Sequence, residues 1–194
     1  MKKYIGVVFC ILFSWNAIAQ ESEFSVNKKW FVPDYARLQF AGNIGFMSAG
    51  VGYELFHKKI ATEFIYGYVP EEYAHTTIHT ITFKTLAPII RKQWLNLIWK
   101  PYMGFAFSYE TGHNSFVSLP DYFPEGYYAS NAFHLSILAG LEIRKDFVET
   151  KFISGIGAYA EAVTVDSFFW YKVNSRQVKV YQVVSLALGV NIYF

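Results

Sequence analysis

The segment from Gln182 to Phe194, QVVSLALGVNIYF, alternates between large apolar residues and small or polar ones. The apolar positions are Val184, Leu186, Leu188, Val190, Ile192 and Phe194. Between them lie Ser185, Ala187, Gly189 and Asn191, with Val183 and Tyr193 at the two ends. Because successive side chains of a β-strand point to opposite faces, the segment is predicted to be a strand with one apolar face.

The same period of two recurs in seven earlier segments of the chain. They lie at about residues 36–46, 49–56, 60–69, 77–86, 97–110, 132–144 and 148–165. The connections after the second and sixth segments are very short, and those after the third, fifth and seventh are longer. The connection after the first segment is short and departs from this rule. An even number of alternating strands, joined by short turns and longer loops in turn, is typical of an up-and-down β-barrel.

The N-terminus has the three parts of an export signal. Two lysines open the chain, residues 4–15 form an apolar run, and Ala17-Ile18-Ala19 is a small-residue cleavage box. The apolar run is shorter than the roughly 20 residues that a membrane-spanning helix needs. We therefore predict a cleaved signal peptide at residues 1–19, a periplasmic N-terminal segment at residues 20–35 and one barrel domain at residues 36–194.

Charge and cysteine content exclude two classes of function. The chain has 17 basic and 15 acidic residues, and two of the lysines belong to the predicted signal peptide. The exported chain is then neutral and has no basic field that would attract nucleic acid. The single cysteine, Cys10, also lies in the signal peptide, so we expect neither a disulfide nor thiol chemistry.

The exported chain is rich in aromatic residues, which make up 20% of the sequence, and it ends on Phe194 at the end of an alternating strand. In this it resembles the small Gram-negative outer-membrane β-barrel class, which is eight-stranded and OmpX/OmpW-like. The resemblance covers about residues 36–194. It implies an all-β fold, an eight-stranded antiparallel up-and-down transmembrane β-barrel, in the cell outer membrane among its lipid and lipopolysaccharide.

The strand face opposite the apolar one carries charged residues of both signs. An eight-stranded barrel is just wide enough inside for side chains to fill it, and an unpaired buried charge is costly. We therefore expect a paired lumen network that leaves no solute channel. Its predicted members are Arg37, Glu54, Glu63, Lys84, Glu142, Arg144, Lys151 and Glu161.

A catalytic alternative rests on His134 and Ser136, which share a strand face with Glu142. These residue types are the components of a nucleophilic hydrolase, and the pair is faintly similar to the H-x-S motif of the outer-membrane lipid A deacylases. That family's pair lies on the strand before last, faces lipid and is followed by asparagine. Here Ile137 follows Ser136 on the sixth strand, and Glu142 lies roughly 20 Å farther along it. We prefer to interpret the pair as polar lumen residues.

Two predicted loops carry clusters of aromatic residues. Such clusters are expensive to expose to water, and aromatic residues dominate the centres of protein interfaces. The sequence therefore predicts a partner protein at the outer loops, with lipid headgroups as the other possible contact. The candidate contact residues are Phe168, Phe169, Trp170, Tyr171, Tyr127 and Tyr128.

The histidines do not have the spacing of a dedicated metal site. His75 and His79 with Glu71 and Glu72 could at most make a weak surface site. We therefore predict a non-enzymatic structural or accessory barrel with no metal and no cofactor. An outer-membrane lipid-modifying hydrolase is the alternative, and a secreted lipocalin-like ligand binder is the third hypothesis.

Overall fold

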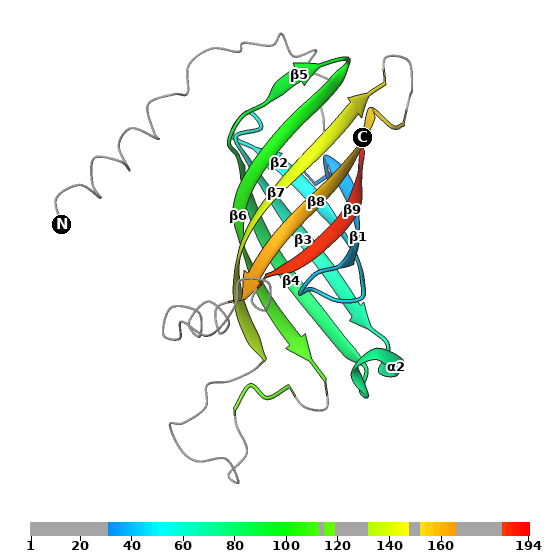
Figure 1. Ribbon diagram of the computed structural model, residues 1–194, viewed down its shortest axis with the longest axis vertical. Helices are drawn as coiled ribbons and strands as arrows, with labels where there is room; N and C mark the ends of the chain where they lie inside the picture. Colours follow the sequence, from blue (N-terminus) through cyan, green and yellow to red (C-terminus); the bar gives the residue numbers. More distant parts are fainter. Residues whose placement is uncertain (1–30, 113–114, 119–131, 148–151, 166–183) are drawn as a thin grey trace, which may run out of the picture. The chain divides into compact units, whose positions relative to one another are not determined.

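The computed structural model describes residues 31–112, 115–118, 132–147, 152–165 and 184–194 (Figure 1). The chain divides into two compact units, Met1–Val32 and Pro33–Phe194, and all described strands belong to the second. The predicted signal peptide, and the periplasmic segment up to residue 30, lie outside the described residues. Within the described ranges, no helix has the length and apolar character needed to cross a membrane.

Strands make up almost all of the regular structure of the described residues. In chain order the elements are β1 (Tyr35–Ala41), β2 (Met47–Leu55), β3 (Ile60–Val69), α2 (Glu71–Ala74), β4 (Ile78–Pro88), β5 (Lys92–Trp94), β6 (Leu97–Thr111), β7 (Phe133–Asp146), β8 (Gly155–Val165) and β9 (Ser185–Tyr193).

Eight of these strands close into a barrel. β1 pairs with β2 on one side and with β9 on the other. β4 pairs directly with β6, although the short β5 lies between them in the chain. All the pairings are antiparallel, and barrel strands that follow one another in the chain are neighbours around the cylinder. The predicted eight-stranded antiparallel up-and-down β-barrel is therefore confirmed. β5 pairs with β6 and stands outside the ring of eight (Figure 1).

The two ends of the barrel differ in their connections. At one end, here called the turn end, lie the β2–β3 turn, the β5–β6 hairpin, the β7–β8 connection and the end of β9. At the other, the loop end, lie α2 and the connections β1–β2, β6–β7 and β8–β9. Figure 1 shows β5 and α2 at opposite ends of the cylinder. The predicted loops at residues 111–131 and 166–176 follow β6 and β8 in the chain, and most of their residues lie outside the described ranges.

The period of two sorts side chains between the interior and an outward wall. On β1, Arg37 and Gln39 are buried, whereas Leu38 and Phe40 are exposed. Each of the eight barrel strands contributes exposed apolar side chains to the wall. They include Leu38, Phe40, Met47, Val51, Phe64, Tyr66, Ile81, Phe83, Met103, Phe105, Phe107, Leu135, Ile137, Ile156, Leu186 and Leu188. Charged and polar side chains thus lie inside, together with buried apolar residues such as Ile65, Leu86 and Leu138, and large apolar side chains cover the outside.

The first strand is shorter than the sequence predicts. The alternation predicts a strand over about residues 36–46 with Ile44 on the apolar face, but β1 ends at Ala41. Ala41 and Gly42 have φ angles of 60° and 87°, and this left-handed backbone redirects the chain. Ile44 consequently turns inward, where it is 1% exposed. The prediction for Ile44 was wrong because a left-handed turn breaks the period of two.

The segment predicted as a turn at residues 87–94 contains a strand. β4 continues to Pro88, and β5 then forms a hairpin with the start of β6, with Lys92 opposite Trp99. Leu95 and Asn96 make its two-residue turn, with φ angles of 51° and 59°. Two positive φ angles are typical of a type I′ hairpin turn. A leucine in this position carries no turn signal, so the pattern alone misses the hairpin.

Two further boundaries differ from the prediction. The seventh predicted strand begins near residue 148, whereas β8 begins at Gly155. The Phe147 backbone N–H donates to the Ser154 carbonyl at 2.8 Å, which brings the two ends of the connection together ahead of β8. The predicted loop at residues 70–76 contains the single helical turn of α2, which follows Pro70.

Inward tyrosines pack over glycines of the neighbouring strand. Tyr35 is opposite Gly52, Tyr102 is opposite Gly140, and Tyr159 is opposite Gly189. A Cβ atom at Gly52 would lie 2.1 Å from Tyr35 Cζ, a distance that no packed structure allows. The glycines therefore make room for the large tyrosine rings inside a barrel whose interior is just wide enough for side chains to fill.

Gly140→Ala tests this packing. A Cβ at residue 140 would lie 2.5 Å from Tyr102 Cζ and 2.9 Å from the Ala160 carbonyl oxygen. We expect the free energy of unfolding to fall by about 1–3 kcal/mol, as measured by urea titration of the refolded protein. Gly112→Ala is the control, because the nearest atom to a Cβ there is the Ser115 hydroxyl oxygen at 3.3 Å. Equal losses in the two variants would contradict the argument.

Candidate functional site

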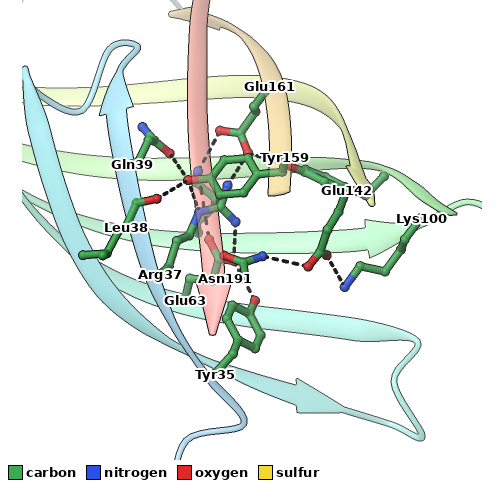
Figure 2. Close-up of polar contacts among 12 residues, drawn as sticks. Tyr35, Arg37, Leu38, Gln39, Glu63, Lys100, Glu142, Tyr159, Glu161 and Asn191 are labelled. Carbon is green, nitrogen blue, oxygen red and sulfur yellow. Dashed lines mark hydrogen bonds and ion pairs between the residues drawn. The ribbon is translucent and has the colours of Figure 1, made fainter. Parts of the chain in front are cut away.

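Arg37 is the centre of the buried polar interior. Its side chain points from β1 into the lumen and is contacted by residues of distant strands (Figure 2). The guanidinium donates to Glu63 Oε1 at 2.6 Å and to Glu161 Oε2 at 2.9 Å. Its Nε donates to the Tyr159 hydroxyl at 2.8 Å. One arginine therefore joins strands β1, β3 and β8 across the inside of the barrel.

Lys84 completes this central cluster as a second cation. Its Nζ donates to Glu161 Oε1 at 2.7 Å and lies 4.0 Å from Glu63 Oε2. Glu63 and Lys84 face each other directly in the β3–β4 register. Two cations and two carboxylates thus neutralise one another. All four side chains are almost completely buried, so each depends on the others for the interactions that water would otherwise provide.

Tyrosine hydroxyls supply further donors to the same carboxylates. Tyr35 donates to Glu63 Oε1 at 2.6 Å, and Tyr102 donates to Glu161 Oε2 at 3.0 Å. A buried ion pair is favourable only when such additional hydrogen bonds satisfy its remaining lone pairs. The cluster and its tyrosines therefore close the middle of the lumen as one connected network.

A second charged cluster lies nearer the turn end. Lys100 and Glu142 are opposite each other in the β6–β7 register, with Nζ and Oε2 2.6 Å apart. Glu142 Oε1 also accepts from the Tyr193 hydroxyl at 2.5 Å and from Asn191 Nδ2 at 3.0 Å. Lys100 Nζ lies 3.7 Å from Glu54 as well. This cluster ties the closing strand β9 to β6 and β7.

The proposed catalytic pair at the loop end has other partners. Ser136 is completely buried, and its Oγ accepts from Asn43 Nδ2 at 2.7 Å. Asn43 belongs to the β1–β2 connection that folds inward beside Ile44. His134 Nε2 lies 3.7 Å from Glu110 Oε2 at the partly exposed mouth. In the described part of the chain, no hydrogen bond joins Ser136 to His134, so the structure does not bring the two together as a nucleophile and a base.

The predicted lumen residues converge on these clusters. Arg37, Glu63, Lys84 and Glu161 form the central one, Glu54 and Glu142 belong to the second, and Lys151 lies outside the described residues. Arg144 packs over the Tyr193 ring, 3.6 Å from its centre, and contacts Asp146. The prediction omitted Lys100 and the inward tyrosines Tyr35, Tyr102, Tyr159 and Tyr193. The strand's period of two could have identified Lys100, because it lies two residues from Tyr102 and therefore on the same face.

The remaining predicted sites are the aromatic contact residues and the weak metal site. Phe168, Phe169, Trp170, Tyr171, Tyr127 and Tyr128 all lie outside the described residues. Across the described ranges, no three histidine, cysteine or carboxylate side chains are arranged to hold a metal ion. His79 packs against Tyr66, whose hydroxyl lies 2.6 Å from His79 Nδ1.

The charged groups of the interior thus neutralise one another. The central carboxylates are paired with cations and tyrosine hydroxyls, and the side chains at the centre of the lumen are buried. The outward wall, by contrast, is apolar and exposed along every barrel strand. Comparisons with protein-family models, with curated proteins and with solved structures found no match to this chain.

Arg37→Met should strongly destabilise the barrel. The substitution leaves two buried carboxylates with Lys84 as their one remaining cation in the central cluster, and removing one partner of a buried ion pair costs about 3–5 kcal/mol. The measurement is the free energy of unfolding of the refolded protein in urea. Arg91→Met is the control, because Arg91 is partly exposed and lies 4.0 Å from Glu54. It should cost less than about 1 kcal/mol. A comparable loss in both variants would show that Arg37 is not the centre of the network.

Proposed function

We propose that this protein is a non-enzymatic outer-membrane β-barrel with a structural or accessory role. The observation that carries the proposal is the distribution of side chains between the two faces of the closed sheet. Charged and hydroxyl groups are buried in the lumen, whereas large apolar groups are exposed on the wall. Soluble proteins rarely expose contiguous apolar patches above a few hundred Å², and transmembrane barrels expose such a band all round.

The height of the apolar band supports the same proposal. On β6 the outward residues from Trp99 to Tyr109 include Met103, Phe105 and Phe107 and no charged residue. Ten residues of strand extend about 33 Å. With the strand tilt of roughly 40° found in such barrels, this corresponds to a height of about 25 Å, which is the usual height of their apolar band. Trp99 and Tyr109 would then lie in the two interfacial aromatic girdles.

The loop and turn ends suggest an orientation. In barrels of this kind the short turns face the periplasm and the longer loops face outward. The turn end of this protein carries the two-residue hairpin turn at Leu95 and Asn96 and the short β2–β3 turn. The predicted signal peptide supports export. The loop end would accordingly face the outside of the cell.

The accessory role rests on the aromatic residues of the loop end. Within the described residues, Phe46 and Tyr73 stack there with ring centres 4.5 Å apart, and Tyr73 is exposed. The predicted contact residues 127–128 and 168–171 lie outside the described ranges, and in the chain they follow β6 and β8, whose last residues lie at the loop end. Aromatic side chains concentrate in the energetic centres of interfaces, so we assign this end to a partner protein.

The other two hypotheses receive less support. A lipid-modifying hydrolase would need an accessible serine, whereas Ser136 is buried under Asn43. A lipocalin-like binder needs an interior cavity for its ligand, whereas the central lumen here holds four buried charged side chains. Ser136→Ala tests the hydrolase directly, since it would abolish lipid hydrolysis by a serine enzyme, and faster migration of the unboiled variant on a detergent gel checks that its barrel still assembles.

Location in the outer membrane is tested by fractionation. We expect the protein to sediment with outer membranes and to migrate faster unboiled than boiled on a detergent gel, because closed barrels resist detergent until they are heated. Recovery of the folded protein from the soluble periplasm or the medium would refute the membrane proposal.

Leu188→Arg distinguishes a lipid-facing wall from a water-facing one. Leu188 lies near the middle of β9 and is 59% exposed. An arginine at the bilayer midplane costs about 2–4 kcal/mol, whereas an exposed substitution in a water-soluble protein changes stability by less than about 0.5 kcal/mol. The measurement is the unfolding free energy in lipid vesicles. Leu95→Arg at the hairpin tip, where Leu95 is 74% exposed, is the control and should be neutral.

Simultaneous replacement of Phe169, Trp170 and Tyr171 by serine tests the partner. Wild-type protein purified in mild detergent should retain a companion protein, and the triple variant should lose it. Phe56→Ser is the control, because Phe56 is an exposed aromatic residue of the turn end. If the wild type is purified alone, or if the triple variant keeps its companion at full yield, the accessory role fails.

A further inference from the structure

The outward wall contains an apolar groove. Its volume is about 550 Å³, and it runs across β4, β6, β7 and β8. Ala87, Met103, Ala139 and Ala162 are consecutive neighbours across these strands in the pairing register. The small side chains of the three alanines form the bottom of the groove, and the larger side chains of Met103 and Phe105 also line it. The groove is therefore a hollow in the wall, bordered by large outward side chains such as Met103, Phe105 and Ile137.

A second hollow lies at the turn end of the same wall. It has a volume of about 330 Å³ and is lined by Lys92, Trp94 and Trp99. Lys92 is directly opposite Trp99 in the β5–β6 hairpin, so the two side chains share one face. The two indole rings are tilted to each other, with centres 6.2 Å apart. Trp94 is 61% exposed, so the hollow opens to the surroundings of the protein.

The two hollows follow one another along β6. Trp99 lines the second hollow and Met103 lines the groove, four residues farther along the same outward face. Four residues of strand extend about 13 Å. Half of a bilayer's hydrocarbon core is about 15 Å thick. A molecule that places its polar end at Lys92 would therefore place its apolar part in the groove, within the same leaflet.

Charge identifies the polar end of this molecule. Among the residues that the structure describes, Lys92 has no carboxylate partner, and Lys59 and Lys145 are also exposed at the turn end. The exposed acids Glu71 and Glu72 lie at the loop end, on α2, and the exposed acid Asp146 of the turn end is paired with Arg144. An ammonium group is a common binder of phosphate, and tryptophans are enriched at the headgroup level of membranes. The ligand that matches the charge and the tryptophans of the turn-end hollow is thus an anionic lipid headgroup.

We propose that the wall holds one anionic phospholipid of the surrounding bilayer. Its phosphate lies against Lys92 between Trp94 and Trp99, and one acyl chain fills the groove over Ala139. This inference rests on the proposed membrane insertion and adds to it a specific lipid site in the leaflet at the turn end. An amphiphile fits better than a protein segment, because the observations combine one cationic, aromatic-rimmed end with a groove lined mainly by apolar residues.

The test uses the full exported chain, refolded and analysed by native mass spectrometry after incubation with phosphatidylglycerol or with phosphatidylcholine. The wild type should retain one phosphatidylglycerol molecule in preference to phosphatidylcholine. Lys92→Gln should reduce this preference about fivefold, the usual contribution of one basic residue at an anionic membrane surface. Ala139→Phe should fill the groove and reduce retention of both lipids.

Two matched controls separate the site from general effects. Lys59→Gln removes an exposed lysine of the same end that does not line the hollow, and Ala49→Phe enlarges an exposed alanine on β2, away from the groove. Both should retain lipid as the wild type does. Equal retention of the two lipids, unchanged binding in Lys92→Gln and Ala139→Phe, or a lipid-free dimer that occupies the groove would overturn the inference.

A vesicle flotation assay on the same variants distinguishes failure of the phospholipid site from failure of the membrane proposal. If the wild type floats with vesicles but shows none of the expected lipid preference, the phospholipid site is refuted and the membrane proposal stands. If the wild type does not float, both are refuted. Because Lys92→Gln and Ala139→Phe alter single outward side chains, their flotation also shows whether a loss of lipid reflects the site or a failure to assemble.

Discussion

The pairing of Arg37 with Glu63 and Glu161 is the interaction on which the rest of the structure depends. Eight strands enclose a space that side chains alone can fill, so charges placed there have no water to solvate them. Arg37 meets both carboxylates within 2.9 Å, and Lys84 balances the remaining negative charge. Because these residues come from β1, β3, β4 and β8, their mutual neutralisation is possible only when the sheet has closed.

Closure and neutralisation together account for the inverted distribution of the side chains. With the charged groups buried in the lumen, the period of two places large apolar residues on the outside of every barrel strand. In water this wall would favour aggregation, whereas in a bilayer it is the part of the molecule that lipid solvates. The proposed membrane location is therefore the environment in which both faces of the sheet are satisfied at once.

The two ends of the cylinder then serve different proposed contacts. The loop end carries the stacked Phe46 and Tyr73, of which Tyr73 is exposed, and this suits recognition of another protein. The turn end combines the tryptophans of the β5–β6 hairpin with exposed lysines, which suits lipid headgroups. A filled lumen between them separates these roles, because the central charged network leaves the wall and the ends as the accessible surfaces.

The alternation in the sequence determined the eight barrel strands, most of their inward and outward faces, and most of the charges that share the lumen. It did so because a strand's period of two is a local property of the backbone. It could not show that Ile44 turns inward, since that depends on left-handed backbone at Ala41 and Gly42, nor that Leu95 and Asn96 close a hairpin. The tertiary structure alone decided which charges meet. Arg37 lies 26 residues from Glu63 and 124 residues from Glu161, and only the register of a closed barrel brings such distant side chains into contact.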